Sequence, residues 1–323
     1  MALHTVLCDL LGVRVPLLNA PMTPQAGGAL ARAVSAAGAF GMLGFDEDES
    51  EASIAEQARV ANEGGARFGI GLAAWVLDRR PALLDLAISM RPALVSVSFG
   101  DPAPYVRALH DAGIIVASQV QNRTWARAAI DAGADVIVAQ GTEAGGHTGS
   151  VGTLPLLQLV LEMTDKPVLA AGGIATGRGF AAVLAAGAAG AWIGTPFLLA
   201  RESRTKPAAQ ARIIASDETQ TIYTSVYDRV QGKPWPVEFR GRALRNPFVE
   251  RWHEHEDELL ATPAAVEEFG AAKAQGDYTR AHIYAGQSVG ALRDVESANA
   301  IVSRLEADAT ARLRAARAIT EPR

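Results

Sequence analysis

One glycine-rich stretch carries the side chain best suited to acid–base chemistry. His147 lies in residues 140–149, directly after a short apolar run, and no apolar periodicity surrounds it. A free imidazole exchanges protons near neutral pH, which suits proton transfer. No group of cysteine, histidine and carboxylate residues with metal-ligand spacing accompanies it. We therefore predict that His147 is catalytic and binds no metal.

Two glycine pairs have the composition of a phosphate site. Gly172-Gly173 and Gly194-Thr195 each end a separate apolar run. Glycine lets the main chain approach an anion closely, and backbone N–H groups near a helix start can bind it. Either pair alone would equally suit tight packing of a helix on a strand. Because the two runs are neighbours in the predicted fold, we expect the pairs to bind one phosphate together.

These residues need elements that bring them to one place, and a repeated unit supplies such elements. Eight apolar runs of strand length recur between residues 15 and 198, and most lack the polar alternation of a half-exposed strand. Helical patterns lie between them, so we predict an α/β fold, a parallel (β/α)8 TIM barrel. An open doubly wound sheet is the alternative, although residues 19–28 hold no GxGxxG turn to support it. The runs are Val15–Met22, Phe40–Phe45, Phe68–Ala74, Leu94–Gly100, Ile114–Val120, Val136–Gly141, Pro167–Ile174 and Ala191–Leu198.

Local signals mark the ends of the helices. Thr23-Pro24 and Thr176-Gly177 resemble helix starts with a capping hydroxyl. Glycine after alanine ends several helices, because glycine tolerates the left-handed conformation found there. These pairs are Ala37-Gly38, Ala112-Gly113, Ala132-Gly133 and Ala186-Gly187.

The chain changes character near Arg201. We predict a barrel domain over residues 1–200 and a C-terminal helical segment over residues 201–323, packed on the barrel and suited to cap its mouth. Residues 291–315 form an amphipathic pattern within it. A homodimer through this tail is left open, as is a place in the substrate cavity for Tyr223, Tyr227 and Trp235. His253 and His255 could suggest a metal site, but residues two apart do not share a side of a helix, so we expect a solvated helix face there.

Composition excludes several partners. The formal charge of -5 argues against nucleic acid, because no basic excess is present to neutralise phosphates. Cys8 is the only cysteine, which favours a cytoplasmic protein without disulfides. Residues 180–200 are long and apolar enough to span a bilayer, yet they contain three glycines and a proline and divide into a helix and a strand. We therefore expect no membrane segment.

These motifs together resemble the nitronate monooxygenases, formerly called 2-nitropropane dioxygenases. Residues 143–149 (EAGGHTG), 171–174 (AGGI) and 194–195 (GT) carry the similarity, and residues 19–22 (NAPM) match at the end of the first strand. Residues 285–288 (AGQS) are similar to a late motif of the family. The EAGGH loop is shared chiefly with a sister group, the flavin-dependent enoyl-acyl-carrier-protein reductases.

The resemblance implies FMN, bound without a covalent link, with His147 facing the substrate above the ring. Two departures concern the ring. Residues 69–73 lack the amide side chain that the family often has after the third strand, and Gln119 stands where some members have lysine. The implied cofactor-binding residues are Ala20, Pro21, Met22, Thr23, Gln119, Gln140, Ala144, Gly145, Gly172, Gly173, Gly194 and Thr195.

The implied activity is oxidation of nitronates or nitroalkanes by O2 to a carbonyl compound and nitrite. His147 would abstract the α-proton of a neutral nitroalkane or bind the nitronate as a cation. One alternative is an NAD(P)H-dependent flavin reductase of the enoyl-acyl-carrier-protein reductase type. The other is a non-catalytic barrel that binds flavin or another phosphate ester. The partners expected are a small-molecule substrate and O2, and the sequence does not specify which substrate.

Overall fold

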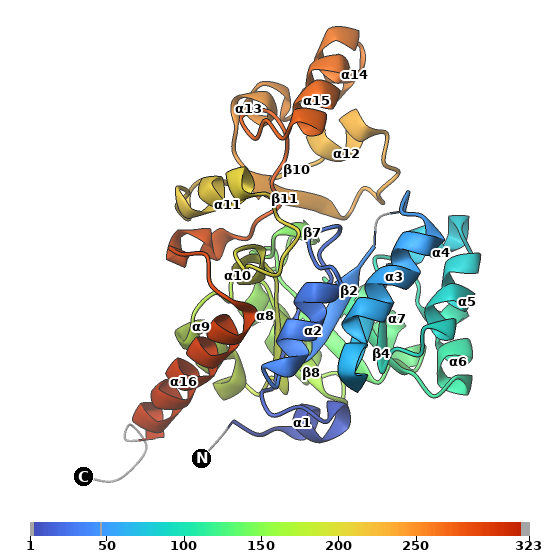
Figure 1. Ribbon diagram of the computed structural model, residues 1–323, viewed down its shortest axis with the longest axis vertical. Coiled ribbons are helices and arrows are strands. Elements are labelled where there is room, and N and C mark those ends of the chain that lie inside the picture. Colours follow the sequence, from blue (N-terminus) through green and yellow to red (C-terminus); the bar gives the residue numbers. More distant parts are fainter. Residues whose placement is uncertain (1–2, 46, 318–323) are drawn as a thin grey trace.

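Within residues 3–45 and 47–317, which the computed structural model describes, eight parallel strands form a barrel (Figure 1). Their order is β1-β9-β8-β6-β5-β4-β3-β2, and a parallel bridge from Leu18 of β1 to Phe40, just before β2, closes the ring. The predicted barrel is confirmed and the open sheet is excluded. The strands are β1 (Leu17–Asn19), β2 (Gly41–Gly44), β3 (Phe68–Ala73), β4 (Leu94–Ser98), β5 (Ile115–Val120), β6 (Val136–Gln140), β8 (Val168–Ala171) and β9 (Gly190–Ile193).

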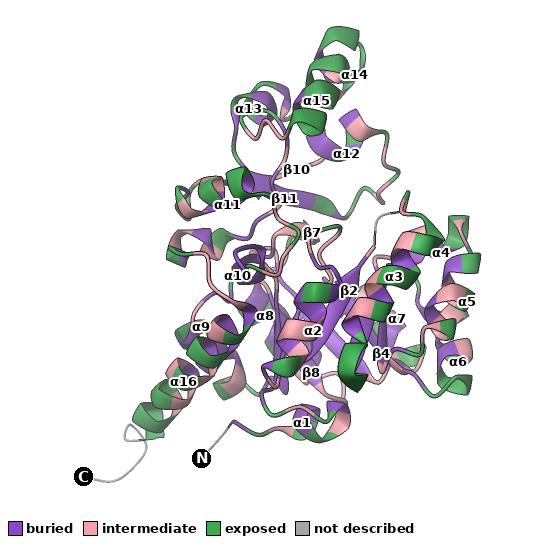
Figure 2. Cartoon of the chain, in the orientation of Figure 1, coloured by how far each residue is buried: buried purple, intermediate pink, exposed green. Residues whose placement is uncertain are grey.

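Alternate strand residues enter two separate apolar clusters, as the period of two in a strand requires. Leu94 and Val138 belong to a smaller cluster that fills the barrel, whereas Val95 and Ile137 belong to a larger one shared with the surrounding helices. Both clusters are buried, so the strands lack an exposed face (Figure 2). This explains why the strands read as continuous apolar runs in the sequence.

The barrel helices begin and end largely where the sequence predicts. Thr176 caps α9 by accepting a hydrogen bond from the Gly179 amide, and all four predicted Ala-Gly ends are confirmed, each with glycine at positive φ. The predicted helix start at Thr23-Pro24 is wrong. The Thr23 hydroxyl donates to Phe45 O, and α2 begins only at Gly28. The helices are α1 (Val6–Leu11), α2 (Gly28–Ala36), α3 (Glu51–Ala61), α4 (Ala74–Arg79), α5 (Ala82–Ser89), α6 (Ala103–Asp111), α7 (Arg123–Asp131), α8 (Thr153–Leu161), α9 (Gly177–Ala185) and α10 (Thr195–Leu198), with a 3-10 turn at Glu63–Gly65.

The last predicted strand is too long. It ends at Ile193, and after Gly194 the short helix α10 begins at Thr195, because Pro196 cannot donate to a sheet but fits the first turn of a helix. Residues 180–200 therefore divide into the end of α9, β9 and α10. No helix in the described part of the chain is long and apolar enough to cross a membrane.

The tail is mostly helical, as expected, but it also contributes two strands that no pattern in the sequence indicated. β10 and β11 pair antiparallel, and β11 also pairs with β7 (Gly146–Thr148), so a three-stranded sheet lies over the barrel mouth (Figure 1). The tail elements are α11 (Pro207–Ile214), β10 (Thr221–Thr224), α12 (Val226–Gln231), β11 (Arg240–Leu244), α13 (Pro247–Trp252), α14 (Glu256–Leu260), α15 (Pro263–Gln275), a 3-10 turn at Gln287–Ala291, and α16 (Ala298–Arg317).

Helix α16 returns to the barrel and lies beside α9 and α2 in the outer layer (Figure 1). It covers most of the predicted amphipathic segment, with Ile301 and Leu305 buried. The approach to α9 is close, since a Cβ at Gly177 would lie 2.5 Å from Asp308 Cβ. The last helix of the tail therefore completes the helical layer of the barrel. Whether residues 1–200 form a separate domain stays a prediction.

Two glycines with opposite surroundings test this packing. A Cβ at Gly41 would collide with the Ala31 carbonyl of α2, so we expect Gly41→Ala to lower the free energy of unfolding by about 3 kcal/mol, the upper end for overpacking. Gly270 in α15 has open space around it, so Gly270→Ala should raise that free energy by about 0.5–1 kcal/mol. Urea unfolding of both variants measures the difference. Equal stabilities would contradict the packing of α2 on β2.

Candidate functional site

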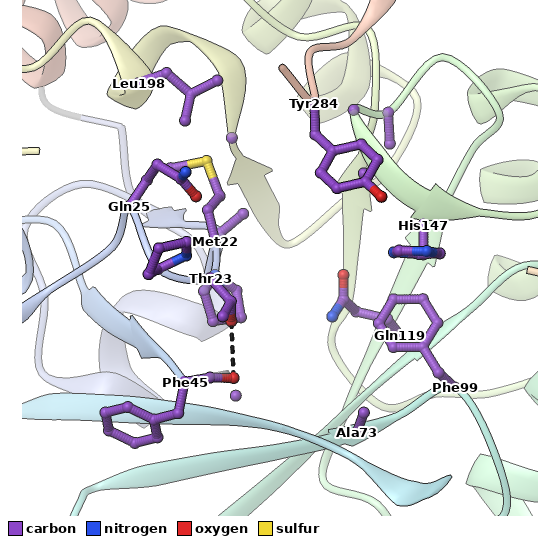
Figure 3. A pocket seen from close by; sticks show the side chains of 18 of the residues that line it. Met22, Thr23, Gln25, Phe45, Ala73, Phe99, Gln119, His147, Leu198 and Tyr284 are labelled. Carbon is purple, nitrogen blue, oxygen red and sulfur yellow. Dashed lines mark hydrogen bonds between the residues drawn. The ribbon is translucent and has the colours of Figure 1, made fainter. Parts of the chain in front are cut away.

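A cavity of about 550 Å³ opens at the carboxyl ends of the barrel strands, where barrels of this kind place their chemistry. Figure 3 shows Met22, Thr23 and Gln25 on one side of it, with Phe99, His147 and Tyr284 on the other. The amide of Gln119 extends between the two sides. The structure brings every predicted site residue to this cavity: Ala20, Pro21, Met22, Thr23, Gln119, Gln140, Ala144, Gly145, His147, Gly172, Gly173, Gly194 and Thr195.

The two glycine pairs follow the neighbouring strands β8 and β9, as predicted, and both line the cavity. Gly172 and Gly173 have φ of 101° and 71°, in the left-handed region that favours glycine. A Cβ at Gly172 would also lie 2.9 Å from the Ala144 amide nitrogen. Among the described residues, the N–H groups of Gly172, Gly173 and Gly194 have no hydrogen-bond acceptor. Unsatisfied amides at a closely approachable backbone are what an anion requires.

The carboxylate of Glu143 holds the glycine-rich loop in place. It accepts hydrogen bonds from the Thr153 amide and hydroxyl, each at 2.8 Å, at the start of α8. On the other side of the loop, the buried guanidinium of Arg242 donates to Thr142 O at 2.6 Å. Burial lowers the pKa of Arg242, and the charge of Glu143 opposes that shift. The loop is therefore fixed between a barrel helix and a strand of the tail.

The tail motif at residues 285–288 is fastened to the same loop. Gly286 N donates to Thr195 Oγ1 at 2.9 Å, and Gln287 N donates to Glu143 O at 3.0 Å. A Cβ at Gly145 would lie 2.6 Å from Gly286 N, so both glycines are needed for this approach. Gly286 and Ser288 line the cavity. The tail thus forms part of the site as well as its cover.

His147 lies on β7 in a partly closed aromatic wall. Its Nε2 is 2.9 Å from Asp228 Oδ1 of α12, and both side chains are less than a tenth exposed. The Tyr284 hydroxyl donates to the same carboxylate oxygen at 3.4 Å. Trp235 stacks on the imidazole with ring centres 3.4 Å apart and planes 5° from parallel. A carboxylate only accepts, so Nε2 donates in this pair, and in the neutral form of the ring Nδ1 is the acceptor.

The two predicted glutamines have different surroundings. Gln140 accepts from Gln121 Nε2 at 2.8 Å and donates to His147 O at 3.0 Å, so its amide holds the strand that carries the histidine. Gln119 donates weakly to Ser98 Oγ at 3.5 Å, and its amide faces the cavity (Figure 3). Direct contact of either side chain with a cofactor stays a prediction.

The remaining aromatic and histidine candidates differ in whether they line the cavity. Trp235 lines the cavity, whereas Tyr223 and Tyr227 are not among the described residues that line it. His253 bonds the Thr224 hydroxyl, and His255 pairs with Glu258. Sequence reasoning missed Asp228 and Tyr284 entirely. Asp228 lies in no motif, and Tyr284 directly precedes the motif at residues 285–288 without being part of it. Both are far from His147 in the chain, and the three-stranded sheet and the segment paired with it bring them together.

Comparisons with known proteins agree with this geometry. The family model described as "nitronate monooxygenase" matches residues 59–308. A nitronate monooxygenase of Neurospora crassa is 30% identical over 92% of this chain and 90% of its own length. A methyl-oxo-octahydroindene-carboxyl-CoA dehydrogenase of Rhodococcus jostii is 34% identical over 73% of this chain. The chain spans only 65% of that relative's length.

Two solved structures superimpose over nearly the whole chain. FabK from Thermotoga maritima has a TM-score of 0.85 and 28% identity, covering 98% of this chain and 99% of its own. A nitroalkane oxidase from Streptomyces ansochromogenes has a TM-score of 0.80 and 27% identity, covering 97% and 100%. Fold and site together define an oxidoreductase built on a (β/α)8 barrel of the flavin-dependent type. The chain belongs to the nitronate monooxygenase family.

The residues present fit the flavin that this family implies. The free amides of Gly172, Gly173 and Gly194 suit a phosphate, and the cavity between Met22 and His147 suits a flat ring (Figure 3). The cavity volume falls within the range of small-molecule and cofactor sites. No group of three or more His, Cys, Asp or Glu side chains able to hold a metal occurs in the described ranges.

Thr195 links the tail to the barrel, and its removal tests that link. Thr195→Val keeps the shape but leaves the Gly286 amide without its acceptor, so we expect a loss of about 1–3 kcal/mol in unfolding free energy. Thr124→Val, at an exposed position of α7, is the matched control and should change stability by less than about 0.5 kcal/mol. Denaturant unfolding that gave the two variants equal stabilities would rule out the link.

Proposed function

We propose that the cavity binds FMN and that the protein oxidises nitronates or nitroalkanes with O2 to a carbonyl compound and nitrite. The observation that carries the proposal is the buried His147–Asp228 pair on the cavity wall, opposite Met22 and Thr23. A base held in one tautomer beside a flavin site is what removal of the acidic α-proton of a nitroalkane requires. The nitronate monooxygenase of Neurospora crassa and the nitroalkane oxidase named above support it.

The chain's own residues divide between binding and proton transfer. Gly172, Gly173, Gly194 and Thr195 would hold the FMN phosphate, and residues 20–23 would lie along the ring. FMN when bound supplies the electron acceptor of the reaction.

The α-proton of a nitroalkane would pass to His147 Nδ1. The resulting imidazolium is stabilised by the Asp228 carboxylate, which is itself oriented by the Tyr284 hydroxyl. A substrate that arrives as a nitronate needs no proton removed, and for it the charged imidazole would act as a binding partner.

This difference between substrates gives a sharp test. We expect His147→Gln and Asp228→Asn to lower kcat/KM for a neutral nitroalkane by about 10²–10⁴-fold, the usual contribution of a general base. The loss for the preformed nitronate of the same compound should be much smaller, because its proton is already absent. Steady-state oxygen consumption with both forms, measured on FMN-loaded protein, provides the comparison.

His253→Gln is the matched control, since His253 bonds Thr224 in the tail and does not line the cavity. It should leave both rates unchanged. If the His147 variant lost activity equally with nitroalkane and nitronate, the base assignment would be incorrect. FMN-loaded protein without turnover on nitronates, enoyl thioesters or NADH would instead support a non-catalytic flavin barrel.

A second function, oxidoreduction of a phosphate-bearing substrate such as a coenzyme A thioester or NAD(P)H, is favoured by the charge of the cavity mouth. Four cations line it: Arg204, Lys206, Lys233 and Lys273. Lys233 pairs with Glu47 and Arg204 lies 3.6 Å from Glu49, but Lys206 and Lys273 pair with no carboxylate in the described part of the chain. The carboxyl-CoA dehydrogenase of Rhodococcus jostii and FabK are similar in sequence or fold.

The role of the lysines at the cavity mouth can be tested separately from the role of His147. If a phosphate-bearing substrate is used, the double variant Lys206→Ala/Lys273→Ala should raise KM for it by about tenfold. Such a change corresponds to the loss of two exposed ion pairs between these lysines and the substrate's phosphate groups. A charge-matched control is Arg107→Ala/Arg127→Ala, at exposed positions of α6 and α7. Anaerobic rapid mixing of wild-type protein with NADPH, and with enoyl-CoA after reduction, gives the rates. This function would be excluded if NADPH did not reduce the flavin and if the reduced flavin did not react with enoyl-CoA.

A further inference from the structure

Within the described ranges, one buried polar group that lines the cavity has no hydrogen-bond partner. Ser96 lies on β4, is 1% exposed and lines the cavity. In the parts of the chain that the structure describes, its Oγ makes no hydrogen bond. Ser98, two residues further along the same strand, shows the contrast, because its hydroxyl accepts from the backbone N–H of Gln119 at 2.9 Å. A buried hydroxyl is almost always hydrogen-bonded in a folded protein, so Ser96 is missing a ligand atom.

The neighbours of Ser96 explain why the polar side chain at this level of the barrel comes from β4 and not from β3. Gly71 of β3 is its direct partner in the sheet register. A Cβ at Gly71 would collide with the Pro21 ring and would lie 3.5 Å from Ser96 Oγ. Pro21 therefore leaves no room for any side chain on β3 at this position. The polar side-chain atom close to that Cβ position is Ser96 Oγ, on the adjacent strand β4.

We propose that Ser96 donates a hydrogen bond to the polar edge of the flavin ring and sets its reduction potential; this rests on the FMN cofactor proposed above. The ring gains electron density on its nitrogen and carbonyl edge when it is reduced. A donor at that edge consequently binds the reduced form more tightly than the oxidised form. Ser96 and the amide of Gln119, on neighbouring strands, form a polar floor beneath the ring.

The test removes the hydroxyl and follows the flavin rather than turnover. FMN is removed from the purified holoprotein and titrated back into wild type, Ser96→Ala and Ser118→Ala. Ser118 is the matched control, a serine of β5 that is 2% exposed and is not among the described residues lining the cavity. We expect Ser96→Ala to bind FMN about fivefold more weakly, the loss of one net hydrogen bond. Its midpoint potential should fall, by about 30 mV if the reduced form loses tenfold more affinity than the oxidised form.

Stability without the cofactor separates a ligand-binding role from a structural one. An unpartnered hydroxyl has no internal bond to lose, so apo Ser96→Ala should be at least as stable as the apo wild type. FMN should then raise its Tm by less than it raises that of wild type. Unchanged affinity and potential in Ser96→Ala, or an apo protein that is destabilised as much as the holoprotein, would overturn the proposal. A wild type that took up no FMN would overturn the cofactor assignment itself, and its own titration shows this.

Discussion

The pairing of strands β7 and β11 is the interaction that positions the cavity wall formed by His147, Asp228 and Tyr284. His147 lies opposite Gly241 in that pairing, and two residues further along β11 Ala243 bridges to Tyr284. A Cβ at Gly241 would lie 2.7 Å from the Tyr284 ring, so the register requires glycine there. β10, on the other edge of β11, leads directly into α12 and Asp228. One small sheet therefore places the proposed base His147, its carboxylate partner and the tyrosine that donates to that carboxylate.

The site divides its chemistry between two parts of the fold. The barrel supplies the cavity floor and the glycine pairs proposed to hold a phosphate, on short loops that follow the parallel strands and are held by Glu143 and Thr195. The tail supplies the opposite wall of the cavity, through Asp228, Trp235 and Tyr284, and this is the wall proposed to meet the substrate. We therefore expect the tail to set substrate choice and the barrel loops to hold the cofactor. Relatives named for different reactions on one barrel agree with such a division.

The strands, the glycine pairs and the cavity position of His147 were predictable because each rests on a local signal. A strand covered on both faces must be apolar throughout, and a backbone that approaches an anion must carry glycine. Errors came where a local signal had two meanings. Thr23-Pro24 has the composition of a helix start but serves a loop, and Thr195-Pro196 continues an apolar run yet begins a helix. The Asp228 partner was unpredictable, because 81 residues separate it from His147 and no periodicity links them.

The surroundings of His147 limit what a substrate can do there. Trp235 covers one face of the imidazole in close contact, and Asp228 occupies its Nε2 edge. Stacking of a substrate on the covered face is therefore excluded while Trp235 stays in place, and contact at Nε2 would require the buried carboxylate to lose its partner. The Nδ1 edge is the remaining polar approach, in the plane of the ring, which is the direction of proton transfer to a ring nitrogen. The wall consequently favours substrates that present an acidic C–H or an anionic oxygen to Nδ1 over those that bind by stacking alone.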